Sequence, residues 1–202
     1  MADSPRCALV LLAAGASRRM GRAKQLLPVG GGKPLLRQVA EQALAAPVAP
    51  LLVVLGSGAP EIAPSLDGLA LHLVTNDRWA EGMGSSVRAA LRALDAEATA
   101  PDALIIALAD QPDSTAEHLT RLVDTWRDTG RSIVATRAGG KLQPPVLFAA
   151  RWFPQLRELA GDTGARRLLR AHPEAVAAVP LAAAADLDTP ADYDRYLRRT
   201  KC

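Results

Sequence analysis

Short apolar runs alternate with amphipathic helical patterns along most of the chain, and this alternation constrains the fold more than any other feature. Several of the runs are apolar at every position, which is typical of parallel strands covered by helices on both faces. The sequence therefore predicts an α/β fold, a three-layer sandwich with a mostly parallel central sheet, formed as a single domain over residues 1–202. The expected strands are residues 7–13, 51–55, 71–74, 103–109 and 132–136.

Helical periodicity marks three of the segments between these runs. Residues 34–45 place their apolar side chains on one stripe, and residues 85–98 repeat the pattern with Ser85 or Ser86 as the expected N-cap. A third helix follows Ser114 and Glu117, which have capping-box spacing, and Gly130 is placed to end it. Residues 137–166 show little periodicity and much Gly and Pro, so we expect an irregular substrate-binding excursion there.

Composition narrows the class of protein. The formal net charge is +3, but the arginines are scattered and aromatic residues make up only 3% of the chain, unlike the clustered basic and aromatic surfaces of nucleic-acid-binding proteins. Cys7 and Cys202 lie near opposite ends, without the spacing of a metal site or a disulfide framework. The first apolar run is too short to span a membrane and lacks the basic segment of a signal peptide. We expect a cytoplasmic protein that binds neither nucleic acid nor membrane.

The loop after the first expected strand has the composition of a phosphate-binding loop. Gly15 falls where the strand ends, and Arg18, Arg19 and Lys24 add positive charge. The spacing from Gly15 to Gly21 is one residue too long for a P-loop, and the second glycine of the dinucleotide fingerprint is absent. The loop therefore belongs to neither of these two types. An ordinary connection with exposed arginines is the alternative.

Carboxylates follow two other segments at the same predicted edge of the sheet. Asp110 comes directly after residues 103–109, where an acidic side chain suits Mg²⁺ or caps the following segment. Asp186 and Asp188 are alternate residues of an extended segment, so both can face one site, although capping of the next helix also explains Asp188. Ser85 and Ser86 open a helix and can serve an anion or a nucleobase edge. We assign Trp79 to packing.

The chain resembles the MobA-like nucleotidyltransferases, and within them the molybdenum cofactor cytidylyltransferases. The resemblance covers essentially the whole chain and rests on LAAGASRRMGRAKQLLP (12–28), NDRWAEGMGSSV (76–87), ALADQP (107–112), LAGDTGAR (159–166) and DLDTPADY (186–193). It implies a Rossmann-like nucleotidyltransferase fold. It also implies transfer of a nucleotide from a nucleoside triphosphate to a phosphorylated acceptor, with release of pyrophosphate. For this branch the substrates are CTP and the phosphate of molybdenum-bound molybdopterin, and the product serves the maturation of molybdenum hydroxylases.

The same resemblance implies roles for particular residues. Arg19, Lys24 and Asp110 would be catalytic, with Arg19 and Lys24 on the triphosphate, and Asp110 and Asp188 would hold Mg²⁺. The other residues that it places at the substrates are Leu12, Ala13, Ala14, Gly15, Ser17, Gly82, Ser85, Ser86, Asp162 and Arg166.

Two positions bear on the choice of substrates. Ala14 stands where the guanylyltransferase branch usually has glycine, which favours CTP over GTP. Gln143 stands where many relatives have a glycine just ahead of Pro-Val, which puts the identity of the acceptor in doubt. The alternatives are a GTP-dependent guanylyltransferase, transfer to another phosphorylated acceptor, and a non-catalytic carrier or chaperone for molybdopterin. A transient contact with a molybdoenzyme or its chaperone is a further expectation.

Overall fold

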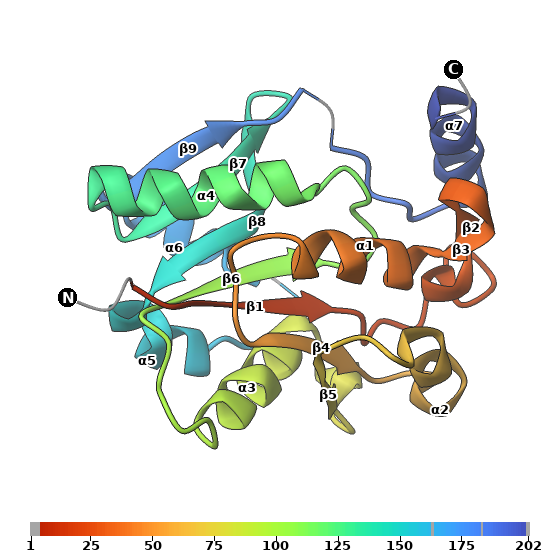
Figure 1. Cartoon of the computed structure of the whole chain (residues 1–202), viewed down its shortest axis with the longest axis horizontal. Helices are drawn as coiled ribbons and strands as arrows, with labels where there is room; N and C mark the ends of the chain where they lie inside the picture. Colours follow the sequence, from red (N-terminus) through yellow and green to blue (C-terminus); the bar gives the residue numbers. More distant parts are fainter. Residues whose placement is uncertain (1–4, 163, 183, 201–202) are drawn as a thin grey trace.

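A computed structural model describes residues 5–162, 164–182 and 184–200, and a twisted sheet organises this part of the chain (Figure 1). Its seven strands lie in the order β5-β4-β1-β6-β8-β7-β9. Neighbouring strands are parallel except at β8, which is antiparallel to both β6 and β7. The expected mostly parallel α/β sheet is therefore confirmed. The strands are β1 (Cys7–Leu12), β4 (Leu51–Leu55), β5 (His72–Thr75), β6 (Ala103–Leu108), β7 (Ile133–Ala138), β8 (Lys141–Ala149) and β9 (Val176–Pro180).

Helices cover both faces of the sheet, which gives the three layers. The α-helices are α1 (Leu35–Leu44), α2 (Ala59–Ile62), α3 (Met83–Leu94), α4 (Ala116–Thr129), α5 (Phe153–Arg157), α6 (Arg166–Ala171) and α7 (Pro190–Thr200). The short 3₁₀ helices are η1 (Lys24–Leu26), η2 (Gly30–Gly32), η3 (Ala63–Leu66), η4 (Trp79–Glu81), η5 (Ala150–Trp152) and η6 (Pro173–Ala175). The two-residue strands β2 (Pro28–Val29) and β3 (Lys33–Pro34) form a separate antiparallel pair.

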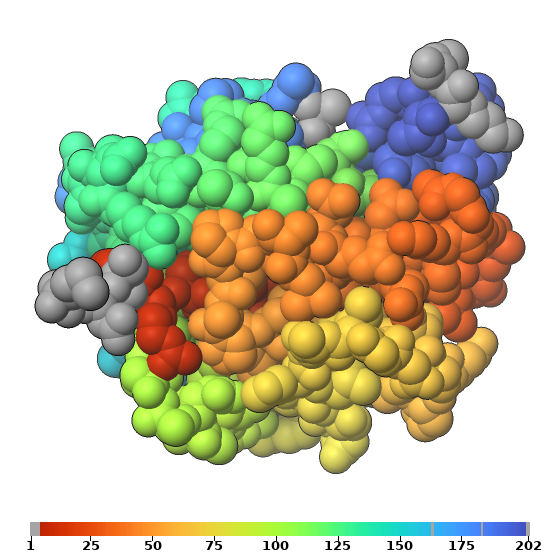
Figure 2. All heavy atoms as spheres, viewed as in Figure 1, coloured from red at the N-terminus to blue at the C-terminus, as the bar shows by residue number. Residues whose placement is uncertain are grey.

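Two apolar cores lie on opposite faces of the sheet because successive strand side chains alternate between the faces. In β4, Val53 packs in one core with α1 and α4, and Leu52 packs in the other with α3. Figure 2 shows the first of these faces, where the atoms of α4 and α1 close over the sheet. Burial on both faces explains why the strand sequences are apolar throughout rather than alternating.

The parallel strands β1, β4 and β6 end at one edge of the sheet, and their exit loops are joined there by backbone hydrogen bonds. The Ala13 amide donates to the Val54 carbonyl at 2.9 Å, and the Ala109 amide donates to the Leu12 carbonyl at 3.2 Å. A further bond joins the Leu187 amide to the Asp110 carbonyl at 3.0 Å. The loops that carry the sequence motifs are therefore neighbours at the carboxyl edge, where α/β proteins bind ligands.

The irregular structure expected for residues 137–166 was wrong, whereas a substrate-binding role for the segment stays a prediction. Much of this segment is regular, because β8 inserts between β6 and β7 and η5 and α5 follow it. The hairpin from β7 to β8 turns at Gly139 and Gly140, both of which have positive φ. Residues 176–180 also form a strand, β9, which pairs with β7 and was not expected.

Two expected helix caps differ from the structure. The helix expected over 85–98 begins at Met83, after Gly82 as N-cap, so neither Ser85 nor Ser86 caps it. The cap of α4 is Thr115, whose hydroxyl accepts from the His118 amide at 3.3 Å, rather than the neighbouring Ser114. Gly130 ends α4 in the left-handed conformation, as predicted. Cys7 is buried and free, and Cys202 lies outside the described residues.

Candidate active site

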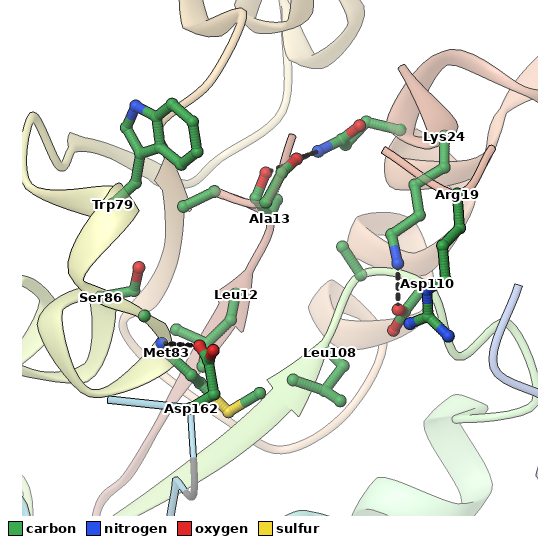
Figure 3. A pocket seen from close by; sticks show the side chains of 15 residues that line it. Leu12, Ala13, Arg19, Lys24, Trp79, Met83, Ser86, Leu108, Asp110 and Asp162 are labelled. Carbon is green, nitrogen blue, oxygen red and sulfur yellow. Dashed lines mark hydrogen bonds and ion pairs between the residues drawn. The ribbon is translucent and has the colours of Figure 1, made fainter. Parts of the chain in front are cut away.

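A pocket of about 350 Å³ opens at the carboxyl edge of the sheet (Figure 3). Its floor is formed where β1 and β6 end, at Leu12 and Leu108. Figure 3 shows Arg19 and Lys24 on one side and Trp79, Met83, Ser86 and Asp162 on the other. The lining residues are Leu12, Ala13, Ala14, Gly15, Arg19, Lys24, Gln25, Trp79, Gly82, Met83, Ser86, Leu108, Ala109, Asp110 and Asp162.

A charged cluster on the basic side joins residues that are far apart in the sequence. The Lys24 Nζ atom, at the start of η1, donates hydrogen bonds to Asp110 and to Asp188 Oδ1, the latter at 3.0 Å. The Arg19 guanidinium lies 2.9 Å from Asp188 Oδ2. Lys24 and Asp110 are largely shielded, with 17% and 14% of their side chains exposed, whereas Arg19 is 70% exposed. The structure thus brings together the two cations and two carboxylates that the sequence singled out.

Burial and charge act against each other in this cluster. Burial lowers the pKa of Lys24, but the attraction of Asp110 and the hydrogen bonds to both carboxylates outweigh it, so the pKa lies above its usual value. Burial raises the pKa of Asp110, and the nearby Asp186 and Asp188 raise it further, against the attraction of Lys24. Lys24 is therefore a fixed positive charge at neutral pH that stabilises the ionised form of Asp110.

The two carboxylates fit a hard divalent cation. Asp110 Oδ1 is buried and has no hydrogen-bond partner among the described residues. Nor do the described residues contain a group of three or more His, Cys, Asp or Glu side chains placed to hold a metal ion. Mg²⁺ commonly takes one or two protein carboxylates and completes its shell with water and substrate phosphates. A pair of aspartates beside an open pocket is the donor set that this mode of binding requires.

A buried glutamine holds the loop that follows β1. The Gln25 Nε2 atom donates to the carbonyl oxygens of Ala13 at 2.8 Å and Gly15 at 3.0 Å, and its Oε1 atom accepts from the Ser17 hydroxyl at 3.2 Å. Ser17 has a positive φ of 52°, and its hydroxyl also accepts from the Lys24 amide at 3.2 Å. Gln25 was missed at the sequence level, because its role depends on carbonyl groups 10 and 12 residues away in the chain.

The opposite side of the pocket depends on a close approach between two segments. Gly82 has a φ of 97°, and a Cβ atom there would lie 2.5 Å from Asp162 Oδ1 and 2.6 Å from the Gly161 carbonyl carbon. Asp162 Oδ1 in turn accepts from the Met83 amide at 3.3 Å. Only glycine combines this backbone conformation with this contact. Gly82 therefore lets residues 161–162 pack against the start of α3.

The remaining predicted residues lie in different places. Ser86 lines the pocket, whereas Ser85 does not. The Ser85 hydroxyl donates to the Gly82 carbonyl and accepts from Asn76 Nδ2, both at 2.8 Å. The Ser17 hydroxyl forms hydrogen bonds within its own loop. Arg166 lines a second pocket. Trp79 packs against an apolar core, as we predicted, and it also lines the pocket. Residue 163, within the 159–166 motif, lies outside the described residues.

This fold and pocket are those of a nucleotidyltransferase. The chain matches the model of the MobA-like NTP transferase domain over residues 9–176, and it belongs to that family. It is 35% identical to the purine catabolism protein PucB of Bacillus subtilis, over 96% of this chain and 98% of that protein. It is 32% identical to the nicotine blue oxidoreductase of Paenarthrobacter nicotinovorans, over 85% of each chain.

Solved structures share the whole architecture. The crystal structure of a homologue of Mycobacterium tuberculosis Rv0371c, from Mycobacterium sp. strain JC1, superposes with a TM-score of 0.84 at 31% identity, over 97% of each chain. Rv0371c in complex with manganese gives a TM-score of 0.79 at 26% identity, over 96% of this chain and 98% of that one. Among the residues described here, no helix combines the length and the apolar character needed to cross a membrane.

Proposed function

We propose that this protein transfers CMP from CTP to the phosphate of molybdopterin and releases pyrophosphate, for the maturation of molybdenum hydroxylases in the cytoplasm. The observation that carries the proposal is the convergence of Arg19, Lys24, Asp110 and Asp188 beside the loop that follows β1. An apolar floor next to two cations and two carboxylates suits a nucleoside joined to a triphosphate. Residues 1–202 act in this proposal as one domain.

The chemistry needs positioning and charge neutralisation rather than a covalent intermediate. An oxygen of the acceptor phosphate attacks the α-phosphorus of CTP in line, a new phosphorus–oxygen bond forms, and the bond to the departing pyrophosphate breaks. Lys24 and Arg19 bind the triphosphate and neutralise the negative charge that grows on the pyrophosphate. Both side chains already lie at the pocket and need only exchange carboxylate contacts for phosphate contacts.

Magnesium is the metal that we propose for the carboxylate pair. Asp110, with its unpartnered oxygen, and Asp188 would hold the ion from two different loops. When bound, Mg²⁺ supplies Lewis-acid stabilisation of charge on phosphate oxygens. The manganese complex of Rv0371c supports a divalent cation on this fold.

Ala14 supports the choice of CTP. It lines the pocket and packs against Gly56, where an added Cβ would lie 2.8 Å from both the Ala14 Cβ and its carbonyl oxygen. The loop is thus held close to the end of β4, with a methyl group where the guanylyl branch has none. Incubation with each nucleoside triphosphate and molybdopterin, followed by measurement of pyrophosphate release, tests this choice. Turnover with GTP that equals or exceeds turnover with CTP would contradict it.

Asp110→Ala is the sharpest test of the metal assignment. We expect a loss of cytidylyl transfer of roughly 100-fold or more, because a ligand that stabilises transition-state charge is removed. The fold should survive, since one side of this carboxylate faces the pocket. Asp124→Ala, at an exposed carboxylate of α4, is the matched control and should leave turnover unchanged. Near-normal turnover of Asp110→Ala with Mg²⁺ would overturn the assignment.

Reduction of a dye-like electron acceptor is the second candidate function, because one relative is named nicotine blue oxidoreductase. Oxidation of NADH or NADPH in the presence of an electron-accepting dye would support it, and we expect none above the protein-free rate.

A carrier or chaperone for molybdopterin would bind the cofactor without any dependence on CTP. Lys24, Asp110 and Asp188 would have no role in such a protein. The cytidylyltransferase proposal also includes a transient contact with a molybdoenzyme or its chaperone, which would receive the product.

A further inference from the structure

A second pocket at the same edge of the sheet is strongly basic. It has a volume of about 470 Å³ and is lined by Lys141, Leu142, Gln143, Arg166, Leu169 and Arg170. We call it the cationic pocket. None of its lining residues is acidic, so three positive charges meet around two leucine side chains and one amide.

These three cations have no partner in the part of the chain that the structure describes. No ion pair or hydrogen bond of their side chains occurs within residues 5–162, 164–182 and 184–200. Other arginines of the chain are paired, as Arg157 is with Asp95 at 2.6 Å and Arg88 with Glu81 at 3.1 Å. Like charges gathered without a counter-charge raise the local positive potential, which attracts an anionic ligand.

Two segments of the chain connect the cationic pocket with the candidate active site. Asp162 lines the active site, and Arg166, the first residue of α6, lines the cationic pocket four positions later in the chain. Strand β8 is antiparallel to β6, with Ile106 opposite Val146, so the start of β8, which carries Gln143, points toward the edge of the sheet at which β6 ends. A molecule in the cationic pocket can therefore present one end to the nucleotide.

We propose that Lys141, Arg166 and Arg170 bind a negatively charged group of the acceptor other than the phosphate that receives the nucleotide. This inference rests on the proposed function, because it requires an acceptor. The volume is that of a ring-sized ligand site. Leu142 and Leu169 provide apolar surface for a flat ring, and the Gln143 amide can both donate to and accept from a polar heterocycle. The acceptor class is thus a heterocycle with anionic groups at two positions.

A binding experiment tests the subsite without any transfer reaction. The probe is pterin-6-carboxylate, a fluorescent heterocycle with an anionic group and no phosphate, titrated into the full chain at low salt. We expect saturable binding that weakens about 10-fold or more in Arg166→Gln/Arg170→Gln, because two charge-assisted contacts are lost. Arg167→Gln is the matched control, since Arg167 is an exposed arginine of the same helix that does not line the pocket. The uncharged 6-methylpterin should bind more weakly to the unmodified protein.

Three results would overturn the subsite. They are no binding of pterin-6-carboxylate to the unmodified protein, equal binding to Arg166→Gln/Arg170→Gln, and an equal loss in Arg167→Gln. Far-ultraviolet circular dichroism and the melting temperature show whether each variant is folded, and Lys141→Gln gives a single substitution outside α6 that should weaken binding in the same direction.

Steady-state kinetics separate this inference from the proposed function. In Arg166→Gln/Arg170→Gln we expect the KM for molybdopterin to rise about 10-fold or more while the KM for CTP stays the same, because two cations are lost from one site only. Cytidylyl transfer with unchanged acceptor KM would overturn the subsite and leave the function standing. Binding of pterin-6-carboxylate that depends on Arg166 and Arg170, in a protein without transferase activity, would support the subsite and overturn the function.

Discussion

Lys24 connects three separate segments of the candidate site. It contacts one carboxylate from the end of β6 and another from the segment before α7, and its own amide is tied to Ser17. The two aspartates would repel each other without it. The same side chain therefore organises the carboxylates in the protein alone and supplies positive charge for a triphosphate.

Lys24→Ala should weaken CTP binding by about 10- to 100-fold, because a charge-assisted contact to the triphosphate is lost from a shielded position. Isothermal calorimetry with CTP measures this directly. Lys33→Ala is the control, because Lys33 is half exposed and forms a surface ion pair with Glu41. Unchanged affinity in Lys24→Ala would contradict the role of Lys24, whatever the effect on turnover.

His118 is a buried residue that nothing in the sequence distinguished. Its Nε2 atom lies 2.8 Å from the Thr136 hydroxyl, which itself donates to the Pro145 carbonyl, so Nε2 is the protonated donor. Its Nδ1 atom is buried without a partner among the described residues. Burial, aided by the charge of Arg121, lowers the pKa of His118 from 6.5 to about 4. His118 is therefore neutral in the folded protein at neutral pH.

This shift predicts a loss of stability in mild acid. Below pH 6.5 the histidine of the unfolded chain becomes protonated, whereas that of the folded chain stays neutral down to about pH 4. The free energy of unfolding therefore decreases as the pH is lowered through this range. Between pH 7.5 and pH 5 the loss from this residue is about 2 kcal/mol. Urea unfolding at both pH values measures it. His118→Gln should lack this part of the pH dependence, and His72→Gln, at an exposed histidine, should keep it.

At the scale of elements, the start of α7 sets the position of Asp188. The Thr189 amide donates to Asp192 Oδ2 at 2.9 Å, and the Asp192 amide donates to Thr189 Oγ1 at 3.3 Å, a reciprocal N-terminal cap. The hydrogen bond from the Thr189 hydroxyl is the main reason why the pKa of Asp192 lies below its usual value. Asp188 directly precedes Thr189, so the turn that caps α7 also fixes where the Asp188 carboxylate lies.

Two capping substitutions separate these properties. Thr189→Ala and Thr115→Ala each remove a cap hydroxyl, from α7 and α4, and each should cost about 1 kcal/mol of stability. Only Thr189→Ala should also reduce cytidylyl transfer, because only its cap adjoins Asp188. Chemical unfolding and pyrophosphate release measure the two effects. An equal fall in turnover for both variants would show that stability alone is responsible.

Strand β8 shows why one element escaped prediction. Its sequence carries Pro144 and Pro145, which ordinarily argue against a strand inside a sheet because proline has no amide hydrogen to donate. The pairing with β7 jumps from Ala135 opposite Val146 to Thr136 opposite Gln143, so both prolines fall in a bulge and need no ladder partner. Whether a proline falls in a bulge depends on its pairing with the neighbouring strand, and the local sequence does not encode that pairing.

At the scale of the whole molecule, the candidate site joins distant parts of the chain. Lys24 follows β1, Asp110 follows β6 and Asp188 precedes α7. A nucleotide bound among them contacts segments that separate when the chain unfolds. Ligand binding to the folded state alone stabilises it in proportion to the logarithm of the ligand concentration.

CTP with Mg²⁺ should therefore raise the melting temperature. At a concentration about 100 times the dissociation constant the stabilisation is about 2.7 kcal/mol, which corresponds to roughly 5–10 °C for a chain of this length. Differential scanning fluorimetry measures the shift, and GTP should give a smaller one. Lys24→Ala and Asp110→Ala should show little shift. A full shift in both variants would place the nucleotide elsewhere.

The sequence by itself determined the layered α/β architecture, because the apolar periodicity of strands and helices is a local property that burial on two faces imposes. It also predicted that Arg19, Lys24 and Asp110 lie at one edge of the sheet, since they follow two strands expected to be parallel. Only the tertiary structure decided that Gln25 holds the loop, that Ser85 turns away from the pocket, and that β8 separates β6 from β7. These depend on contacts between segments far apart in the chain, where packing and hydrogen-bond satisfaction override local preference.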